Sequence, residues 1–158
     1  HPTSRKVSFK STTKLDAQAN RIAPPLPGGP GDPTLGGATV VFYNSAGATT
    51  DDVEIAIPAG LGWTIIGTPS SFKGYRWKGT GAITGITIKA DSLIVKGGKA
   101  SFGYTLDEPS QGRVAVRVVL SGNVGWCADA PGKAGSDRVN KFSAVKRTPA
   151  PGACPAGP

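Results

Sequence analysis

Residues 101–127 carry the strongest apolar alternation in the chain, and they constrain the fold more than any other stretch. Large apolar side chains alternate with small or polar ones on both sides of a breaker-rich run at 107–112, before the chain turns into residues 124–127. Alternation with a period of two predicts strands that each have one apolar face. Three strands joined by two turns predict a β-meander in the core. Its apolar positions are Phe102, Tyr104, Leu106, Val114, Val116, Val118 and Leu120.

The whole chain has the composition of an all-β protein. Its 158 residues suit one domain, and they include 23 Gly, 14 Pro and no Met. Gly and Pro interrupt helices, whereas the abundant Val, Ile and Thr fit pleated sheets. We therefore predict an all-β fold, a β-sandwich of about ten short, mostly antiparallel strands. Besides the meander, the expected strands are 5–13, 38–44, 53–57, 63–66, 74–78, 86–89, 93–96 and one within 137–146 anchored by Val139 and Phe142.

The chain divides into three parts. Residues 1–15 hold an N-terminal strand with Val7 and Phe9 on its apolar face. Residues 16–37 contain five prolines and no strand pattern, which predicts a long, semi-rigid Pro/Gly-rich connection. Residues 38–158 form the sandwich body with a Pro/Gly-rich tail.

The N-terminal strand has two interpretations. In the first, it pairs with the open sheet edge of a neighbouring subunit and buries Val7 and Phe9 there, while residues 16–37 bridge the two bodies. Such a head-to-tail contact predicts a homo-oligomer, and hence a structural protein that assembles into an extracellular filament or surface layer. In the second, the strand packs on its own sandwich. Self-packing of Val7 and Phe9 would argue against exchange.

The two cysteines, Cys127 and Cys154, predict a disulfide that ties the tail to the last strand of the meander. Without histidine partners they cannot complete a zinc site. A structural disulfide indicates an oxidising compartment, so the sequence predicts a secreted protein. The first residue is His1 rather than Met, which we interpret as removal of a secretion signal, and no apolar run is long enough to span a membrane.

The formal net charge is +8. The basic residues are scattered, without an Arg-rich run or an aromatic RNA-binding motif, which argues against a specific nucleic-acid partner. An anionic polysaccharide or a cell surface remains a possible partner. Lysines at polar strand positions or in turns also keep β-proteins soluble; here they are Lys6, Lys10, Lys14, Lys78, Lys89, Lys96 and Lys99.

Signs of catalysis are weak. His1 is the only histidine, so neither a copper site with two imidazoles nor a serine–histidine triad can be completed. Asp107 and Glu108 are adjacent and would face opposite sides of a strand, so turn chemistry explains them better than an acid pair. The sequence therefore predicts no enzyme and no cofactor.

No metal site is expected either, because no calcium-binding loop pattern is present. The least unfavourable calcium ligands are Asp51, Asp52 and Glu54.

Aromatic residues offer an alternative function. Trp63, Tyr75 and Trp77, with Trp126, have the ring types that stack on sugars, which would suit a carbohydrate-binding or adhesive module. Because Tyr75 and Trp77 alternate with charged residues, the core is the expected place for their rings.

Ordered landmarks across nearly the whole chain resemble a family of secreted bacterial β-domains without an assigned activity. They are GDPTLGGATVVFYNSAG, FKGYRW, FGYTLDEPSQGRVAVR, GWCADAP and TPAPGACP, with YTLDEPSQG and the downstream WCA as the most specific. The resemblance implies a secreted, all-β, disulfide-tied domain, and it implies no activity.

Overall fold

The computed structural model describes residues 4–12, 23–99, 101–121 and 125–145, which contain ten strands and one short helix. The strands form one continuous sheet in the order β3-β2-β8-β9-β10-β1-β7-β6-β5-β4. The elements are β1 (Lys6–Thr12), α1 (Pro33–Gly36), β2 (Ala38–Asn44), β3 (Asp52–Ile57), β4 (Trp63–Thr68), β5 (Ser71–Lys78), β6 (Ile83–Lys89), β7 (Ser92–Gly98), β8 (Arg113–Leu120), β9 (Gly125–Arg138) and β10 (Lys141–Ala144). No described helix is both long and apolar enough to cross a membrane.

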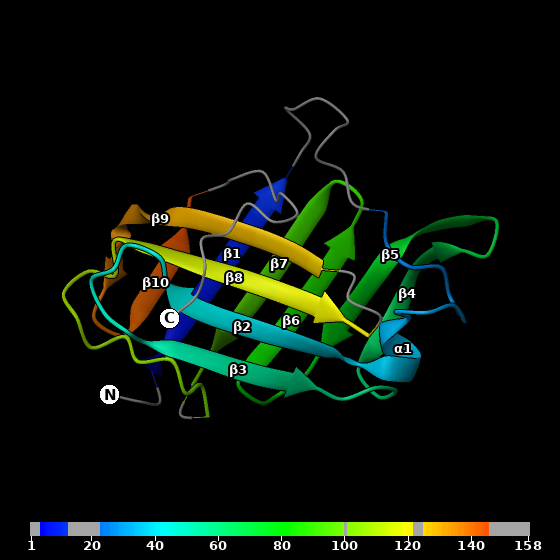
Figure 1. Ribbon diagram of the computed structural model, residues 1–158, viewed down its shortest axis with the longest axis horizontal. Coiled ribbons are helices and arrows are strands. Elements are labelled where there is room, and N and C mark those ends of the chain that lie inside the picture. Colours follow the sequence, from blue (N-terminus) through cyan, green and yellow to red (C-terminus); the bar gives the residue numbers. More distant parts are fainter. Residues whose placement is uncertain (1–3, 13–22, 100, 122–124, 146–158) are drawn as a thin grey trace.

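The sheet curls so that its two halves face each other (Figure 1). One layer, here called the front layer, contains β3, β2, β8 and β9; the back layer contains β10, β1, β7, β6, β5 and β4. The long strand β9 joins them, since residues 125–131 pair with β8 and residues 132–138 pair with β10. All pairings are antiparallel except that of β1 with β10. The predicted all-β fold is confirmed, with the sandwich made from a single folded sheet.

Aromatic rings from both layers meet in the core. The ring of Phe9 in β1 lies 6.0 Å from that of Phe42 in β2 and 5.7 Å from that of Phe142 in β10. Phe102 packs edge-on against Phe42 at 5.3 Å. All four side chains are fully buried. The Phe9–Phe42 contact crosses between the layers, so burial of these rings holds the curled sheet closed.

The N-terminal strand completes its own sheet. β1 pairs with β7 from Lys6 to Thr12 and with β10 from Lys6 to Ser8, and both Val7 and Phe9 are buried in the core of the same chain. β7 and β10 would otherwise each present an unpaired edge, and β1 satisfies both. For the single chain this is the arrangement of the second interpretation, and exchange of β1 between chains stays a prediction.

The described part of the predicted connection, residues 23–37, packs on the body of its own chain. The Tyr75 hydroxyl donates to the Pro25 carbonyl at 2.8 Å, and burial, with the nearby Asp32 carboxylate, raises the pKa of Tyr75 to about 12. Asp32 is buried and caps α1 by accepting from the Thr34 amide at 2.8 Å, and its other carboxylate oxygen accepts from the Gly28 amide at 2.6 Å. This helix was not expected, although Asp followed by Pro is a helix-start signal.

The meander prediction is wrong in its first strand. Phe102, Tyr104 and Leu106 are buried as expected, but residues 101–112 contain no strand. Both edges of β8 are already paired, with β2 on one side and β9 on the other, so no ladder remains for this segment. It crosses the end of the sandwich as an extended loop, with the Leu106 carbonyl accepting from the Asn140 amide.

The last strand is also shorter than predicted. Phe142 anchors β10, but Val139 lies in the turn before it and is 47% exposed. The turn places Asn140 at a φ of 64°, a left-handed conformation that asparagine tolerates. β9 takes up residues to Arg138 that were expected to belong to the final strand.

Candidate functional site

The aromatic residues proposed as a sugar platform lie in the core. Trp63 and Trp77 are each only 7% exposed, and Tyr75 is fully buried. The rings of Trp63 and Trp77 are tilted by 53°, and the Trp63 indole donates to the Pro58 carbonyl at 2.9 Å. Trp126 is buried as well. These rings therefore form no exposed, coplanar surface on which a sugar could stack.

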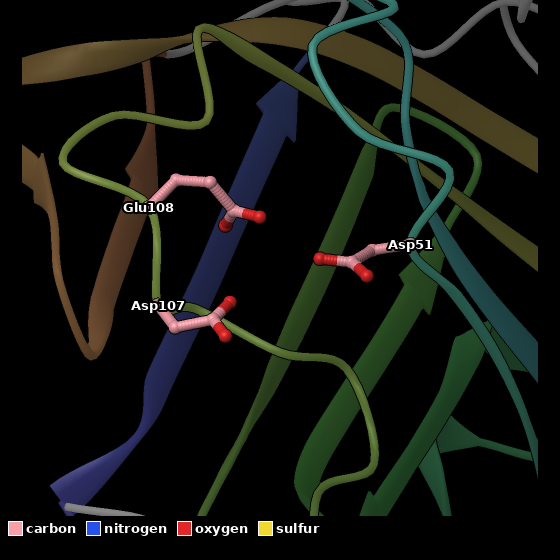
Figure 2. A group of neighbouring side chains, drawn as sticks. All are labelled: Asp51, Asp107 and Glu108. Atoms are coloured by element: carbon pink, nitrogen blue, oxygen red, sulfur yellow. The ribbon is translucent and has the colours of Figure 1, made fainter.

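A second candidate is a cluster of three carboxylates at one end of the sandwich. Asp107 and Glu108, from the loop before β8, turn toward Asp51, which precedes β3 (Figure 2). One oxygen from each lies within 4.8 Å of the others. The predicted calcium candidates included Asp51, but its expected companions Asp52 and Glu54 are exposed on β3 and do not join it.

A buried polar network lies close to this cluster. Gln111 is 1% exposed; its side-chain oxygen accepts from the Tyr104 hydroxyl at 2.8 Å and from the Asn44 amide at 3.3 Å. Burial raises the pKa of Tyr104 well above its usual range, and the charges of Asp51 and Glu108 raise it further. The hydroxyl therefore stays protonated and keeps its role as a donor.

The carboxylates of this region hold the loop of residues 101–112 in place through hydrogen bonds. Thr105 donates to Asp51, and the Gln111 side-chain amide donates to Glu108. The Asp137 carboxylate of β9 accepts from the backbone amide of Gln111 at 2.7 Å. Carboxylate oxygens are ligands that calcium takes, but hydrogen bonds within the chain already account for this arrangement, and we assign the cluster no ligand.

The third candidate is the outer surface of the back layer. Because side chains alternate across a strand, each strand that buries apolar residues turns its other side chains outward. On five strands these outward positions carry seven basic residues and, within the described part of the chain, no carboxylate. We call this surface the basic face. Its cations are Lys6, Lys10, Arg76, Lys78, Lys89, Lys96 and Lys141.

Strand register gathers part of the basic face around one glycine. Lys78 of β5 is paired with Gly85 of β6, which is paired with Lys96 of β7. Strands lie about 4.8 Å apart, so the two lysines flank a bare backbone position across about 10 Å. A shallow groove of about 370 Å³ lies here. Its outward-facing lining comprises Arg76, Lys78, Thr84, Gly85, Thr87, Ile94 and Lys96.

The cations of the basic face are not neutralised within the described residues. The ion pair found among the described residues joins Arg113 to Asp129 at 3.0 Å. It lies on the outer surface of the front layer and involves no cation of the basic face. Asp91 lies nearest in sequence, in the turn between β6 and β7, and not on an outward strand position. The surface therefore keeps a concentrated positive potential.

The predicted disulfide falls partly outside the described residues. Cys127 lies in β9 on the outer surface of the front layer, beside Tyr43 and Ala115. No cysteine in the described part is free. Cys154 is not described, and neither is His1, so the bridge between Cys127 and Cys154 stays a prediction.

Sequence reasoning missed the basic face because its cations are spread from residue 6 to residue 141. One signal was present: the polar positions of five of the six strands in the back layer carry Lys or Arg and no acid. Comparison with protein-family models, curated protein sequences and solved structures found no match. The resemblance to secreted bacterial β-domains therefore also stays a prediction.

Proposed function

We propose that this chain is a secreted, non-enzymatic β-sandwich module that binds an anionic polysaccharide through the basic face. The observation that carries the proposal is the presence of seven cations and no described carboxylate on the outward strand positions of the back layer. A surface with one sign of charge attracts polymers of the opposite sign. The net charge of +8 acts in the same direction.

The neutral side chains of the face favour a polysaccharide over other polyanions. Ser8, Thr87 and Ser92 occupy outward positions, where hydroxyls can hydrogen-bond to sugar hydroxyls. No aromatic residue lies at an outward position of the described strands of this face, whereas proteins that hold single-stranded nucleic acid stack bases on aromatic rings. Charge with hydroxyls, and without rings, suits an acidic sugar polymer.

Charge reversal tests this proposal. In the double variant Lys78→Glu/Lys96→Glu we expect affinity for heparin, measured by calorimetry, to fall by about tenfold or more. Binding of the unaltered protein should also weaken as salt rises, because exposed charges are screened. The control is Lys99→Glu/Lys133→Glu, which makes the same charge change at exposed lysines outside the basic face.

Three outcomes would contradict the proposal. They are an unaltered protein that binds neither heparin nor alginate, a control variant that loses as much affinity as the test variant, and tighter binding to duplex DNA than to either polysaccharide at equal salt.

Assembly by exchange of β1 is a second candidate, supported by the place of this strand in the sheet. β1 lies between β7 and β10, and residues 13–37 separate it from β2. The slot that β1 fills would be the same in a second chain, which is the condition for domain swapping. Exchange predicts oligomers or filaments by light scattering and electron microscopy, and a soluble monomer after deletion of residues 1–14 that binds a peptide of residues 3–14. A native protein that is monomeric at all concentrations would refute it.

A further inference from the structure

We infer that the groove over Gly85 is a subsite that seats one acidic sugar residue of the polysaccharide, with Lys78 and Lys96 on either side and Arg76 binding its carboxylate or sulfate. This inference rests on the proposed function, and it replaces a diffuse charged surface with a defined position.

The backbone does not require glycine at position 85. Its φ is not in the left-handed region, and a Cβ added there would meet only the Trp77 carbonyl, at 3.8 Å. The sheet register shifts between Ile83 and Gly85, but this irregularity does not place Gly85 at positive φ. Glycine weakens a strand interior, and it often marks a place where a ligand approaches the backbone closely. The consequence here is a bare floor between two lysines.

The groove wall offers the groups that an acidic sugar needs. Arg76 lies two residues before Lys78 on the same side of β5, and its planar guanidinium can bind a carboxylate or sulfate through two parallel hydrogen bonds. Lys78 and Lys96 supply point charges from both sides. Ile94 provides an apolar surface for the C–H groups of the ring, and Thr87 a hydroxyl.

The position of the hydroxyls is partly set by the sheet. The Thr84 hydroxyl donates to the Lys96 carbonyl at 3.3 Å. Thr84 therefore turns its oxygen toward β7, which carries Lys96, and the lone pairs of this oxygen remain for sugar hydroxyls. Among the described residues, no carboxylate lines the groove to compete for its cations.

A steric change that leaves every charge in place tests the subsite. Gly85→Val adds a side chain over the groove floor, where the new Cβ makes one ordinary contact with the Trp77 carbonyl, and it raises β propensity, so the fold should be kept. We expect affinity for a sulfated, uronate-containing disaccharide from heparin to fall by about tenfold, the effect of a well-placed contact. The matched control is Gly81→Val, in the exposed β5–β6 turn, where an added Cβ meets nothing within 4 Å.

The outcomes separate the two proposals. If Gly85→Val binds the disaccharide as the unaltered protein does, with an unchanged melting curve, the subsite is refuted. The proposed function survives that result provided Lys78→Glu/Lys96→Glu still loses binding, and both fall if neither variant has an effect. If Gly85→Val weakens binding of duplex DNA as much as binding of heparin, the groove recognises any anion, and the assignment to a sugar residue is overturned. Should Gly85→Val melt at a lower temperature, the smaller Gly85→Ala replaces it under the same criteria.

Discussion

Replacement of Phe9 by alanine is the sharpest test of the closed sheet. Phe9 is fully buried, and its ring contacts Phe42 in the opposite layer at 6.0 Å and Phe142 in the neighbouring strand at 5.7 Å. Phe→Ala substitutions in cores cost about 3–5 kcal/mol, and each aromatic pair adds about 0.5–1.5 kcal/mol beyond the buried area. We therefore expect the free energy of unfolding to fall by about 4–5 kcal/mol.

Urea unfolding followed by tryptophan fluorescence measures this loss. With a slope near 2 kcal/mol per molar, the midpoint should fall by about 2 M. The control is Lys10→Ala, one position along the same strand with its side chain exposed, which should change stability by less than about 0.5 kcal/mol. A loss below about 1 kcal/mol for Phe9→Ala would refute the packing of β1 as described.

The same experiment distinguishes self-packing from exchange. If β1 completes its own sheet, the unfolding midpoint of the unaltered protein does not depend on protein concentration. If β1 is donated by a second chain, the midpoint rises with concentration by mass action. A concentration-dependent midpoint would therefore contradict the self-packed strand even if Phe9→Ala is destabilising.

Two further predictions concern the cap of α1 and the cysteines. Burial alone would raise the pKa of Asp32, but hydrogen bonds from Gly28 and Thr34 lower it overall, so its contribution to stability is present above the usual value of about 3.9 and is lost as pH falls below it. Asp32→Asn should cost about 1–2 kcal/mol at pH 7 and remove this part of the acid dependence; equal stability at pH 7 would contradict the cap. Native protein should weigh two hydrogens less than reduced protein if Cys127 and Cys154 are bridged, and two free thiols would exclude the bridge.

The local residue pattern was sufficient to predict a strand and its buried face wherever these follow from the segment's own residues. The alternation in residues 38–44 predicts a strand with the bounds that β2 has. Likewise, the alternation of Tyr75 and Trp77 with Arg76 and Lys78 correctly favoured the core over a sugar platform. A period of two places side chains on opposite faces whatever the rest of the chain does, so such predictions need no tertiary information.

Pairing, by contrast, depends on which edges are free. The alternating residues 101–106 are buried but form no strand, because β2 and β9 occupy both edges of β8. The pattern of the N-terminal strand did not identify its neighbours, and only the tertiary structure shows that β7 and β10 of the same chain have edges that fit it. Which strands pair depends on the tertiary arrangement, and the hydrophobic pattern of a single strand does not identify its partners.

The sequence by itself determined the all-β class, most of the strands and the apolar side of each one, because these follow from residue types and a two-residue period. Only the tertiary structure decided which polar sides lie together. Asp51 meets Asp107 and Glu108 through loops that converge at one end of the sandwich. The cations of the basic face come from five strands that are distant in the chain, and they gather on one surface because the strand order makes those strands neighbours.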